Sequence, residues 1–544
     1  MGNNVDKTKE IIENGQAVLG IEFGSTRIKA ILIAPDKKPI AEGSHEWENR
    51  LLRGIWTYTY EDIWDGFRSA YKALKEDVKA KYGVTLKKLK GMGISAMMHG
   101  YLAFGKNEEE KVKAGEAPSP LVPFRTWRNN ITEDAADKLT MLFNYNIPER
   151  YSISHIYQAI LDEEDHVDDI TFCTTLAGYV HWCLTGKKCL GIGDASGMFP
   201  IDAEAKKYNQ EMMDKFSSLL MVQELNWKLI DILPKILLAG EDAGKLTKKG
   251  VLLMDPEGDL EEGIPLCPPE GDAGTGMTAT NAVRVMTGNI SAGTSVFAMI
   301  VLEKELEKYY KEIDIVTTPD GSPVAMVHAN NCTSDLNAWV NIFREFADTF
   351  GMDISNDDLY GKLYNKALEG DKDCGGLLSY GYVSGENITG ITEGRPLFVR
   401  KPDSKFTLAN FMRTHLYSAL AAIRLGMVIL SKENVVIKRV IGHGGLFKTE
   451  GVGQRVVSAA MNTPVTVMET AGEGGAYGIA LLADYMLYKE EEEGLADYLD
   501  KKVFEGAEGI TEVPDKEETL GFSEFTKRYV NGLPIEDEAG HSLV

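Results

Sequence analysis

Asp272 has the sequence surroundings of a carboxylate that can act as a general base. It lies between Gly271 and the pair Ala273-Gly274, so small neighbours leave the side chain open to a ligand. A carboxylate in such a loop can accept the proton of a hydroxyl group that attacks a phosphoryl group. A turn aspartate in a glycine-rich loop is the structural alternative, and the local pattern taken alone favours it. The catalytic interpretation therefore depends on motifs elsewhere in the chain.

Two turns of small residues are candidates for binding the phosphate groups of a nucleotide. Each lies between two apolar runs, within residues 17–34 and 286–302, and this pattern predicts two β-hairpins. Small residues let backbone N–H groups approach phosphate oxygens, and serine and threonine add hydroxyl donors. An ordinary hairpin turn is the alternative, but the recurrence favours phosphate binding and indicates two related domains. The residues are Gly24, Ser25 and Thr26 in the first turn, and Gly293, Thr294 and Ser295 in the second.

Lys29 and two glycine pairs extend this candidate nucleotide site. Lys29 follows the first turn and could reach a phosphate, although a solvated lysine is the favoured interpretation. Gly444-Gly445 and Gly474-Gly475 each follow a predicted strand and open a predicted helix. Their backbone could lie flat against an adenine ring, and helix N-termini favour phosphate, while a helix-cap glycine is the alternative. Neither pair completes a G-x-G-x-x-G pattern, so a dinucleotide-binding fold is disfavoured.

Strands that alternate with helices must position these residues. Apolar residues at helical spacing predict helices, and short apolar runs predict strands. Their alternation predicts an α/β architecture. Residues 491–544 are charged and weakly patterned, so we expect an exposed extension there rather than a third domain. The predicted helices cover residues 60–81, 407–431 and a segment that ends at 460, and the predicted strands cover 89–96, 435–442 and 465–468.

Composition disfavours several classes of function. The chain has 544 residues and a formal net charge of −24, whereas a nucleic-acid binder needs a basic face, so nucleic acid is not an expected partner. The first residues lack an apolar signal-peptide core, and no continuous run of about 18 apolar residues is visible, so we expect no membrane span. The six cysteines match no C-x-x-C pattern. They predict reduced, mostly buried thiols and a cytoplasmic location.

Six motifs along the chain resemble those of the FGGY carbohydrate kinases, members of the actin-like ATPase superfamily. Any one of them is weak evidence, but all occur in the family's order over residues 17–485. Within the family, the chain is most similar to the xylulokinase-like group, through Met98-His99-Gly100 and residues 331–335. The motifs are the first phosphate hairpin GIEFGSTRIKA, the sugar loop SAMMHG, the catalytic loop PEGDAG, the second phosphate hairpin ISAGTSVF, the signature segment YVSGE, and the adenosine-binding end VIGHGGLFKTEGVGQRVVSAAMNTPV with EGGAYGIALLA.

The resemblance implies an α/β fold of two actin-like ATPase (ribonuclease H-like) lobes with a cleft between them. The lobes would be residues 1–284, which bind the sugar, and residues 285–490, which bind ATP, followed by the charged extension 491–544. The implied reaction transfers the γ-phosphoryl group of MgATP to a hydroxyl group of a ketopentose, with xylulose favoured. Ribulose or another ketose or polyol is the alternative substrate, and a homodimer is one option for the assembly.

The resemblance also assigns roles in sugar binding. Asp272 would be the base and would contact the sugar, and Met98, His99 and Gly100 would line the sugar site. For His99, which is expected at the end of a strand, a purely structural role is equally supported. Trp127 could form a wall of the sugar pocket, although a buried core tryptophan is an equally good interpretation.

Glu22 stands where the family usually has an aspartate. It would hold a water molecule of a bound Mg²⁺ ion; alternatively, it is a half-buried strand residue paired with a cation such as Arg27. Ala273 replaces the usual asparagine after the base, and His443 interrupts the usual glycine triplet. These departures leave open a non-catalytic sugar or nucleotide sensor, against which Asp272 argues. A chaperone-like or filament-forming ATPase is a third class, and the segments SAMMHG and YVSGE argue against it.

Overall fold

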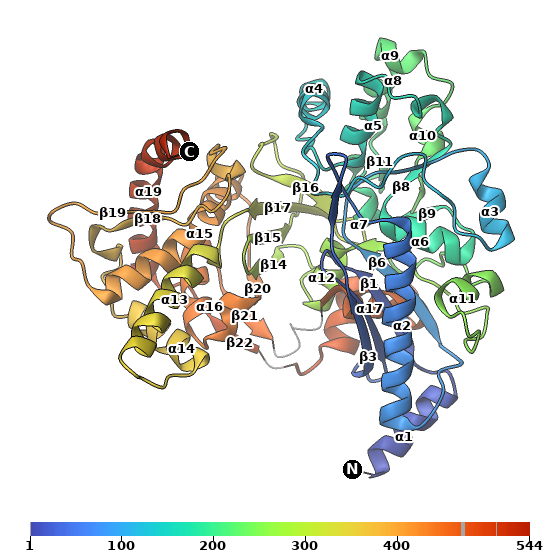
Figure 1. Cartoon of the computed structure of the whole chain (residues 1–544), viewed down its shortest axis with the longest axis horizontal. Helices are drawn as coiled ribbons and strands as arrows, with labels where there is room; N and C mark the ends of the chain where they lie inside the picture. Colours follow the sequence, from blue (N-terminus) through green and yellow to red (C-terminus); the bar gives the residue numbers. More distant parts are fainter. Residues whose placement is uncertain (1, 469–473, 508, 544) are drawn as a thin grey trace. The chain divides into compact units, whose positions relative to one another are not determined.

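The computed structural model of the chain describes residues 2–468, 474–507 and 509–543, and its contacts divide the chain into two compact units (Figure 1). Unit 1 comprises Met1–Val283, Ile315–Val324 and Glu473–Glu505, and unit 2 comprises Arg284–Asp314, Ala325–Gly472 and Gly506–Val544. The predicted division after residue 284 lies close to the first passage of the chain from unit 1 to unit 2. Residues 315–324 and 473–505, which the sequence placed after that division, instead pack in unit 1.

Unit 1 is built around a five-stranded sheet in the order β13-β6-β1-β2-β3. The first hairpin is confirmed, because β1 and β2 pair antiparallel, while β6 runs parallel to both β1 and β13. The strands are β1 (Val18–Phe23), β2 (Arg27–Ile33), β3 (Pro39–Glu46), β4 (Arg50–Leu52), β5 (Ile55–Thr57), β6 (Gly91–Ala96), β7 (Leu102–Phe104), β8 (Phe172–Thr174), β9 (Cys189–Gly191), β10 (Ile201–Asp202), β11 (Lys207–Tyr208), β12 (Lys235–Leu237) and β13 (Glu270–Gly271).

Helices cover both faces of this sheet, and glycines set how closely two of them approach. A Cβ at Gly43 would lie 2.2 Å from the backbone nitrogen of Leu74 on α2, and a Cβ at Gly20 would lie 2.0 Å from the backbone oxygen of Ala476 on α17. Gly20 pairs with Ile31 on β2, and Gly43 pairs with the preceding residue, Ala30, so the two glycines face opposite sides of the sheet. Helices α2 and α17 therefore pack on opposite faces. The helices of unit 1 are α1 (Gly2–Glu13), α2 (Tyr60–Tyr82), α3 (Glu108–Ala114), α4 (Glu133–Phe143), α5 (Ser152–Leu161), α6 (Leu176–Thr185), α7 (Ile192–Ala195), α8 (Gln210–Ser217), α9 (Leu220–Gln223), α10 (Leu229–Ile232), α11 (Lys248–Met254), α12 (Asp272–Ala279), α17 (Gly474–Tyr488) and α18 (Leu495–Tyr498).

Unit 2 repeats the central topology of unit 1. Its main sheet has the order β16-β17-β15-β14-β20-β21-β22. The second predicted hairpin, β14–β15, is antiparallel, and β20 runs parallel to both β14 and β21. The series β15-β14-β20-β21 therefore matches β2-β1-β6-β13, which confirms the internal repeat. The strands are β14 (Thr287–Ala292), β15 (Val296–Val301), β16 (Asp314–Thr317), β17 (Pro323–Ala329), β18 (Leu378–Tyr380), β19 (Leu397–Val399), β20 (Arg439–His443), β21 (Val465–Met468) and β22 (Gly509–Glu512).

The core of unit 2 contains α15, a long apolar helix. Among the described residues it alone is long and apolar enough to cross a membrane, but 72% of its apolar window is buried within the structure, as in the core helix of a folded domain. Arg413 and Arg424 interrupt its apolar run, which is why no continuous 18-residue run is visible in the sequence. The helices of unit 2 are α13 (Thr333–Thr349), α14 (Asn356–Ala367), α15 (Leu408–Lys432), α16 (Val452–Met461) and α19 (Lys516–Ser542).

The C-terminal segment is not the exposed extension that its charge predicted. Three aromatic side chains of α19, Phe522, Phe525 and Tyr529, are completely buried. Arg413 of α15 forms a buried ion pair with Glu518 of α19, so the helix is fastened to the core by both packing and charge. The sequence pattern failed here because charged residues cover the outer face of a helix whose inner face is apolar.

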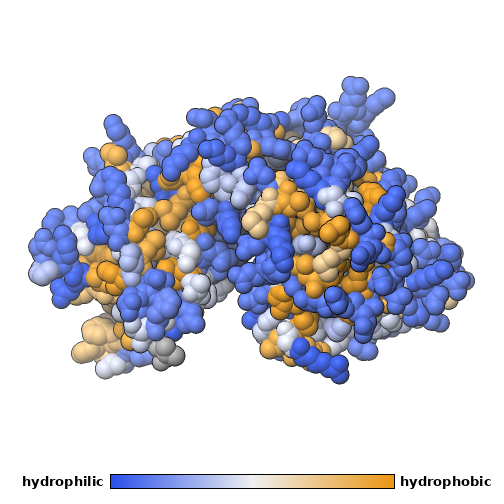
Figure 2. Space-filling view, turned by 90° about the horizontal axis from the view of Figure 1, so that it is seen from above, coloured by the Kyte–Doolittle hydropathy of each residue, from blue (hydrophilic) through white to orange (hydrophobic). Residues whose placement is uncertain are grey.

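Surface and thiol properties agree with the composition. Figure 2 shows a surface on which hydrophilic residues predominate, with smaller apolar areas between them. All six cysteines are free and buried, as their spacing predicted.

Candidate active site

A row of polar side chains crosses the sheet of unit 1 at the carboxyl ends of its parallel strands. The register pairs Glu22 on β1 with Lys29 on β2 and with Ser95 on β6, and Ser95 in turn lies opposite Glu270 on β13. Residues directly opposite each other point to the same face of a sheet, and here that face carries α17. Ligands of open α/β sheets bind outside the carboxyl ends of the strands. Asp272, which follows β13, extends this row.

Asp272 is held at the start of α12 and remains within reach of solvent. Its Oδ1 accepts a hydrogen bond of 3.1 Å from the backbone N–H of Met98, and its side chain is exposed. The surrounding protein raises the pKa of its carboxyl group by desolvation, while backbone N–H groups, including those of Met98 and Ala273, lower it. Met98 therefore acts on Asp272 through its main chain. An accessible carboxylate with a fixed orientation is suited to accept a proton from a bound hydroxyl group.

Glu22 faces the first turn of α17. Its Oε2 accepts a hydrogen bond of 3.2 Å from the backbone N–H of Ala476. Burial first, and then the negative charge of Asp272, raise the pKa of Glu22 to about 7, against the lowering effects of the Ala476 N–H and the Lys29 charge. Arg27, the cation suggested as its partner, instead pairs with Glu46 at 2.8 Å. Arg27 is therefore not the cation beside Glu22; the half-buried glutamate has Lys29 as its neighbouring cation instead.

Gly474 and Gly475 lie beside Glu22 in unit 1, at the start of α17. A Cβ at Gly475 would lie 2.3 Å from Glu22 Oε1 and 2.8 Å from the hydroxyl oxygen of Thr275, so only glycine leaves room for the glutamate. Gly474 has a φ of +72°, which glycine adopts without strain. Both glycines are thus required by the backbone. Contact with ATP, which the sequence assigned to them, stays a prediction.

Lys29 is partly exposed and lies 3.6 Å from a carboxyl oxygen of Glu42 on β3. Its ammonium group therefore shares the edge of the row with two acidic side chains, Glu22 and Glu42. Lys29 is therefore partly solvated and lies beside carboxylates, and its contact with a phosphate group stays a prediction.

His99 already has protein partners for both ring nitrogens. Its Nδ1 lies 3.2 Å from the backbone oxygen of Gly197, and Nε2 accepts a hydrogen bond of 3.3 Å from Arg150. Burial, followed by the charge of Arg150, lowers the pKa of His99 well below its ordinary value, so the ring is neutral. It stacks on Tyr151 with ring centroids 5.0 Å apart. These contacts favour the structural role, in which His99 fixes the loop that presents Met98 to Asp272.

Gly100, the next residue, has a φ of +88°. A Cβ there would lie 2.8 Å from the backbone oxygen of Arg125. Glycine at this position therefore permits the sharp turn after β6.

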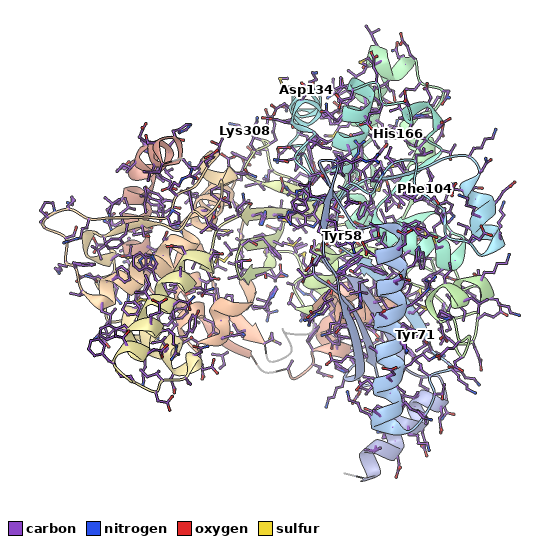
Figure 3. All side chains as sticks on the ribbon, viewed as in Figure 1. Tyr58, Tyr71, Phe104, Asp134, His166 and Lys308 are labelled. Atoms are coloured by element: carbon purple, nitrogen blue, oxygen red, sulfur yellow. The ribbon has the colours of Figure 1, made fainter. Side chains whose placement is uncertain are left out.

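The first small-residue turn, Gly24–Thr26, is held by aromatic side chains that the sequence patterns did not predict. Trp47 Nε1 donates to the backbone oxygen of Gly24 at 2.7 Å. The hydroxyl group of Tyr58, which is labelled in Figure 3, donates to the backbone oxygen of Ser25 at 2.5 Å. The two rings stack with centroids 4.0 Å apart. Trp127 is 39% exposed and donates to the Ser25 hydroxyl at 3.2 Å, so the core interpretation of this tryptophan is wrong. No local motif marks Trp47 or Tyr58, because each contacts the turn from a distant part of the chain.

The second small-residue turn, Gly293–Ser295 in unit 2, is held by polar groups. Gly293 N–H donates to the backbone oxygen of Ser295 at 2.9 Å, which closes the turn. The hydroxyl group of Thr333 donates to the Gly293 oxygen at 2.7 Å, and Cys332 N–H donates to the Thr294 oxygen at 2.9 Å. Both donors belong to the segment that begins α13.

Gly444 and Gly445 lie at the same edge of the unit 2 sheet as the second turn. Gly444 follows β20, has a φ of +102°, and a Cβ there would lie 2.5 Å from the backbone oxygen of Ala292, the last residue of β14. Gly445 opens a short 3₁₀ helix, Gly445–Lys448, and both glycines are exposed. Gly444 is thus required for the close approach of β20 to the turn, and Gly445 leaves an open surface beside it.

Among the described residues, a different acidic cluster has the spacing of metal ligands. Asp255, Glu257 and Asp259 place carboxyl oxygens within 4.8 Å of one another. Lys75 Nζ lies 2.9, 2.8 and 2.8 Å from oxygens of these three residues. A protein ammonium group therefore already serves as the cation for these three carboxylates.

Comparisons with known proteins agree with the geometry. Residues 17–273 match the N-terminal domain, and residues 288–487 the C-terminal domain, of the FGGY family of carbohydrate kinases.

The chain belongs to the FGGY family of carbohydrate kinases.

It is therefore a sugar kinase, a phosphotransferase with an alcohol group as acceptor and ATP as its phosphoryl donor, and its two repeated sheets are the actin-like ATPase lobes of this family. A xylulose kinase of Haemophilus influenzae is 20% identical over 527 residues, which cover 95% of this chain and 99% of the relative. A ligand-bound xylulose kinase and a gluconate kinase, both from Lactobacillus acidophilus, superpose with a TM-score of 0.75 each. Each is 14% identical and covers 97% of this chain; they are themselves covered to 100% and 99%. At this identity the two structures demonstrate the shared fold.

Proposed function

We propose that this FGGY kinase transfers the γ-phosphoryl group of MgATP to a hydroxyl group of a ketopentose, with xylulose as the substrate. The observation that carries the proposal is Asp272, whose exposed carboxylate is oriented by the Met98 N–H at the carboxyl end of β13. The resemblance of the Met98-His99-Gly100 loop to xylulokinases, together with the xylulose kinase relative, supports the choice of sugar.

In the proposed reaction, Asp272 accepts the proton of the sugar hydroxyl group while the oxygen of that hydroxyl group bonds to the γ-phosphorus. The bond between that phosphorus and the oxygen of the β-phosphate breaks, and ADP leaves with the electron pair. Desolvation raises the pKa of Asp272, which makes its carboxylate a stronger base toward the hydroxyl proton. The sugar phosphate and ADP are the products, and Asp272 returns its proton to solvent.

The residues around Glu22 fit a divalent cation. Glu22 and Asp272 are close enough for the charge of one to raise the pKa of the other, and a cation between them and a phosphate would relieve that repulsion. Carboxylate oxygens and water are the ligands that Mg²⁺ prefers. Glu22 would hold the ion directly or through a water molecule, and the ion would offset the charge of the phosphates. A pure sensor needs no such pair.

We assign phosphate contacts to the two small-residue turns, Gly24–Thr26 and Gly293–Ser295, and propose further contacts from Lys29. Gly444 and Gly445 are proposed to contact the adenosine part of ATP, and Gly474 and Gly475 to border the magnesium site. On the sugar side, Trp127 is proposed to contact the substrate next to Ser25, and Met98, His99 and Gly100 to form the loop beneath it.

An assay of ADP release over a panel of pentuloses, hexuloses, polyols and gluconate tests this function. We expect sugar-dependent ADP release with the highest kcat/KM for xylulose. Highest kcat/KM for another member of the panel would replace xylulose as the substrate. ADP release that no sugar stimulates, together with tight sugar binding, would instead support the sensor.

A further inference from the structure

The second phosphate turn owes its shape to hydrogen bonds on its carbonyl groups. The carbonyls of Gly293 and Thr294 both accept from the start of α13, through Thr333 and Cys332. In a trans peptide the C=O and the following N–H point in opposite directions. Fixing these two carbonyls toward α13 therefore directs the N–H groups of Thr294 and Ser295 away from it. Consecutive N–H groups that point the same way form an anion-binding concavity.

The donors that fix these carbonyls lie next to Asn331, a buried residue between β17 and α13. Asn331 is 4% exposed, and both polar atoms of its side chain are engaged by the signature segment YVSGE. Its Oδ1 accepts from the N–H groups of Val383 and Ser384 at 3.0 and 3.2 Å. Its Nδ2 lies 3.2 Å from the Ser384 oxygen and 3.3 Å from the Gly385 oxygen. Asn331 thus locks residues 331–333 onto the signature segment.

Glu386 completes this lock. It is fully buried, and its Oε2 accepts from both the backbone N–H and the Nδ2 of Asn331, each at 3.2 Å. Its Oε1 accepts from the N–H of Ile388 at 3.4 Å. Because a buried carboxylate is stable only when its oxygens are satisfied, Glu386 and Asn331 depend on each other.

We propose that Asn331 and Glu386 are positioning residues for nucleotide binding: they fix the segment whose Cys332 and Thr333 donors turn the N–H groups of the 293–295 turn toward phosphate. This inference rests on the proposed function, in which that turn contacts ATP. It gives the signature segment YVSGE a task at the nucleotide rather than at the sugar. Neither residue touches a substrate in this scheme.

The first test is Asn331→Asp, which keeps the shape of the side chain. The Nδ2 donors are lost, and a carboxylate oxygen is placed against Glu386 Oε2 and two carbonyl oxygens. We expect the KM for ATP to rise about tenfold or more, while kcat at saturating ATP and the KM for the sugar change less than about twofold. Glu386→Gln keeps one acceptor oxygen and should give a smaller rise in the KM for ATP. Binding of ADP, measured by calorimetry, should weaken in parallel.

Asn330→Asp is the matched control. Asn330 is adjacent in sequence, and its side chain donates to the same signature segment, at the Gly385 oxygen, 2.9 Å away, whereas it interacts with Glu386 through its backbone N–H, which the substitution retains. The KM for ATP should stay within about twofold of the wild-type value in this variant. Equal effects of Asn330→Asp and Asn331→Asp would overturn the proposal. So would unchanged ADP affinity in both Asn331→Asp and Glu386→Gln, or losses of ATP and sugar binding in equal proportion.

A variant of the turn itself separates this inference from the proposed function. A Cβ at Gly293 meets no atom within 4 Å, so Gly293→Ala is accommodated without a clash inside the protein. If the turn binds phosphate, the methyl group weakens ADP binding at unchanged thermal stability. Unchanged ADP affinity in Gly293→Ala removes the turn from the nucleotide site and refutes the proposed function there. Weakened binding in Gly293→Ala but not in Asn331→Asp refutes only the positioning role. Thermal unfolding of every variant identifies any that fail to fold. If Asn331→Asp fails to fold, the ADP affinity of Glu386→Gln, the mildest change, tests the positioning role in its place.

Discussion

The turn between β1 and β2 in unit 1 and the turn between β14 and β15 in unit 2 fix the same two carbonyl groups with different donors. In unit 1 the carbonyls of Gly24 and Ser25 accept from the Trp47 indole and the Tyr58 hydroxyl. In unit 2 those of Gly293 and Thr294 accept from the hydroxyl group of a threonine and a backbone N–H. Donors of different chemistry thus fix the carbonyl groups at the same two positions, although the turns differ in length, since the Gly24 N–H donates to the Arg27 oxygen and the Gly293 N–H to the Ser295 oxygen.

The two units differ at the position two residues before each turn. Unit 1 has Glu22 there, facing Lys29 and Ser95, whereas unit 2 has Ser291, facing Phe297 and His443. Among the described residues, the carboxylate at this position therefore belongs to unit 1 alone. The variants below test this difference between the two turns and the hydrogen bonds to carbonyl groups that the turns share.

The largest effect is expected for Asp272→Asn, which keeps the size of the side chain and removes the base. Sugar-dependent ADP release should fall by about 10²- to 10⁴-fold, the range typical for loss of a general base, while sugar binding is retained. Asp259→Asn, in the cluster around Lys75, is the control and should keep its turnover. Near wild-type turnover in Asp272→Asn would remove Asp272 from the base role.

Glu22→Gln should shift the magnesium dependence of turnover at fixed ATP. The amide keeps the length but loses the charge that offsets the cation, so we expect the midpoint to rise by about tenfold, whereas Glu22→Asp stays active. Ser291→Ala, at the equivalent position of unit 2, is the comparison and should leave the midpoint unchanged. An unshifted midpoint in Glu22→Gln would refute the metal site and favour the sensor.

Tyr58→Phe and Thr333→Val each delete one hydroxyl donor to a turn carbonyl while keeping the shape of the side chain. If hydrogen bonds to the turn carbonyls orient the N–H groups in both turns, each variant should raise the KM for ATP by a few-fold, since one hydrogen bond contributes about 1 kcal/mol. Titration of ATP at saturating sugar measures this. An effect of Thr333→Val alone would show that the aromatic support of the first turn serves only stability.

The smallest expected effect is a pH dependence of stability without magnesium. Folding raises the pKa of Glu22 from an ordinary value of 4.5 to about 7, so between these values the folded state holds a proton that the unfolded state has lost. Stability contributed by this group is therefore present below about pH 4.5 and is lost as the pH rises to about 7. The melting temperature of the wild type relative to Glu22→Gln should fall by a few degrees across this range. A constant difference would contradict the raised pKa.

Local patterns were sufficient to predict the scaffold of the site. Alternating apolar runs around small residues predicted both hairpins, and helical spacing predicted α2 and α15 to within a few residues. These patterns are local because strand alternation and helix periodicity act over neighbouring residues. The glycine-rich surroundings of Asp272 are local in the same sense.

Contacts between distant segments could not be predicted in this way. The Ala476 N–H that meets Glu22 comes from 454 residues further along the chain, and the Met98 N–H that meets Asp272 from 174 residues before it. Trp47 and Tyr58 carry no motif, and the burial of α19 depends on the face it presents to α15. For the same reason the sequence left His99 open between two roles, since its partner Arg150 lies in another loop.

The return of α17 to unit 1 has a consequence for synthesis of the chain on the ribosome. Its packing against Gly20 on β1, and against Gly93, where a Cβ would lie 2.6 Å from Ile479, means that one face of the first sheet is completed by residues made about 390 to 460 positions later. Nascent unit 1 must therefore leave this apolar face uncovered while all of unit 2 up to β21 is translated. Domains usually fold in order as they emerge, and exposed apolar surface in such intermediates promotes aggregation. We expect a fragment that ends at residue 283 to depend on chaperones, and a separately supplied 473–505 peptide to restore its solubility.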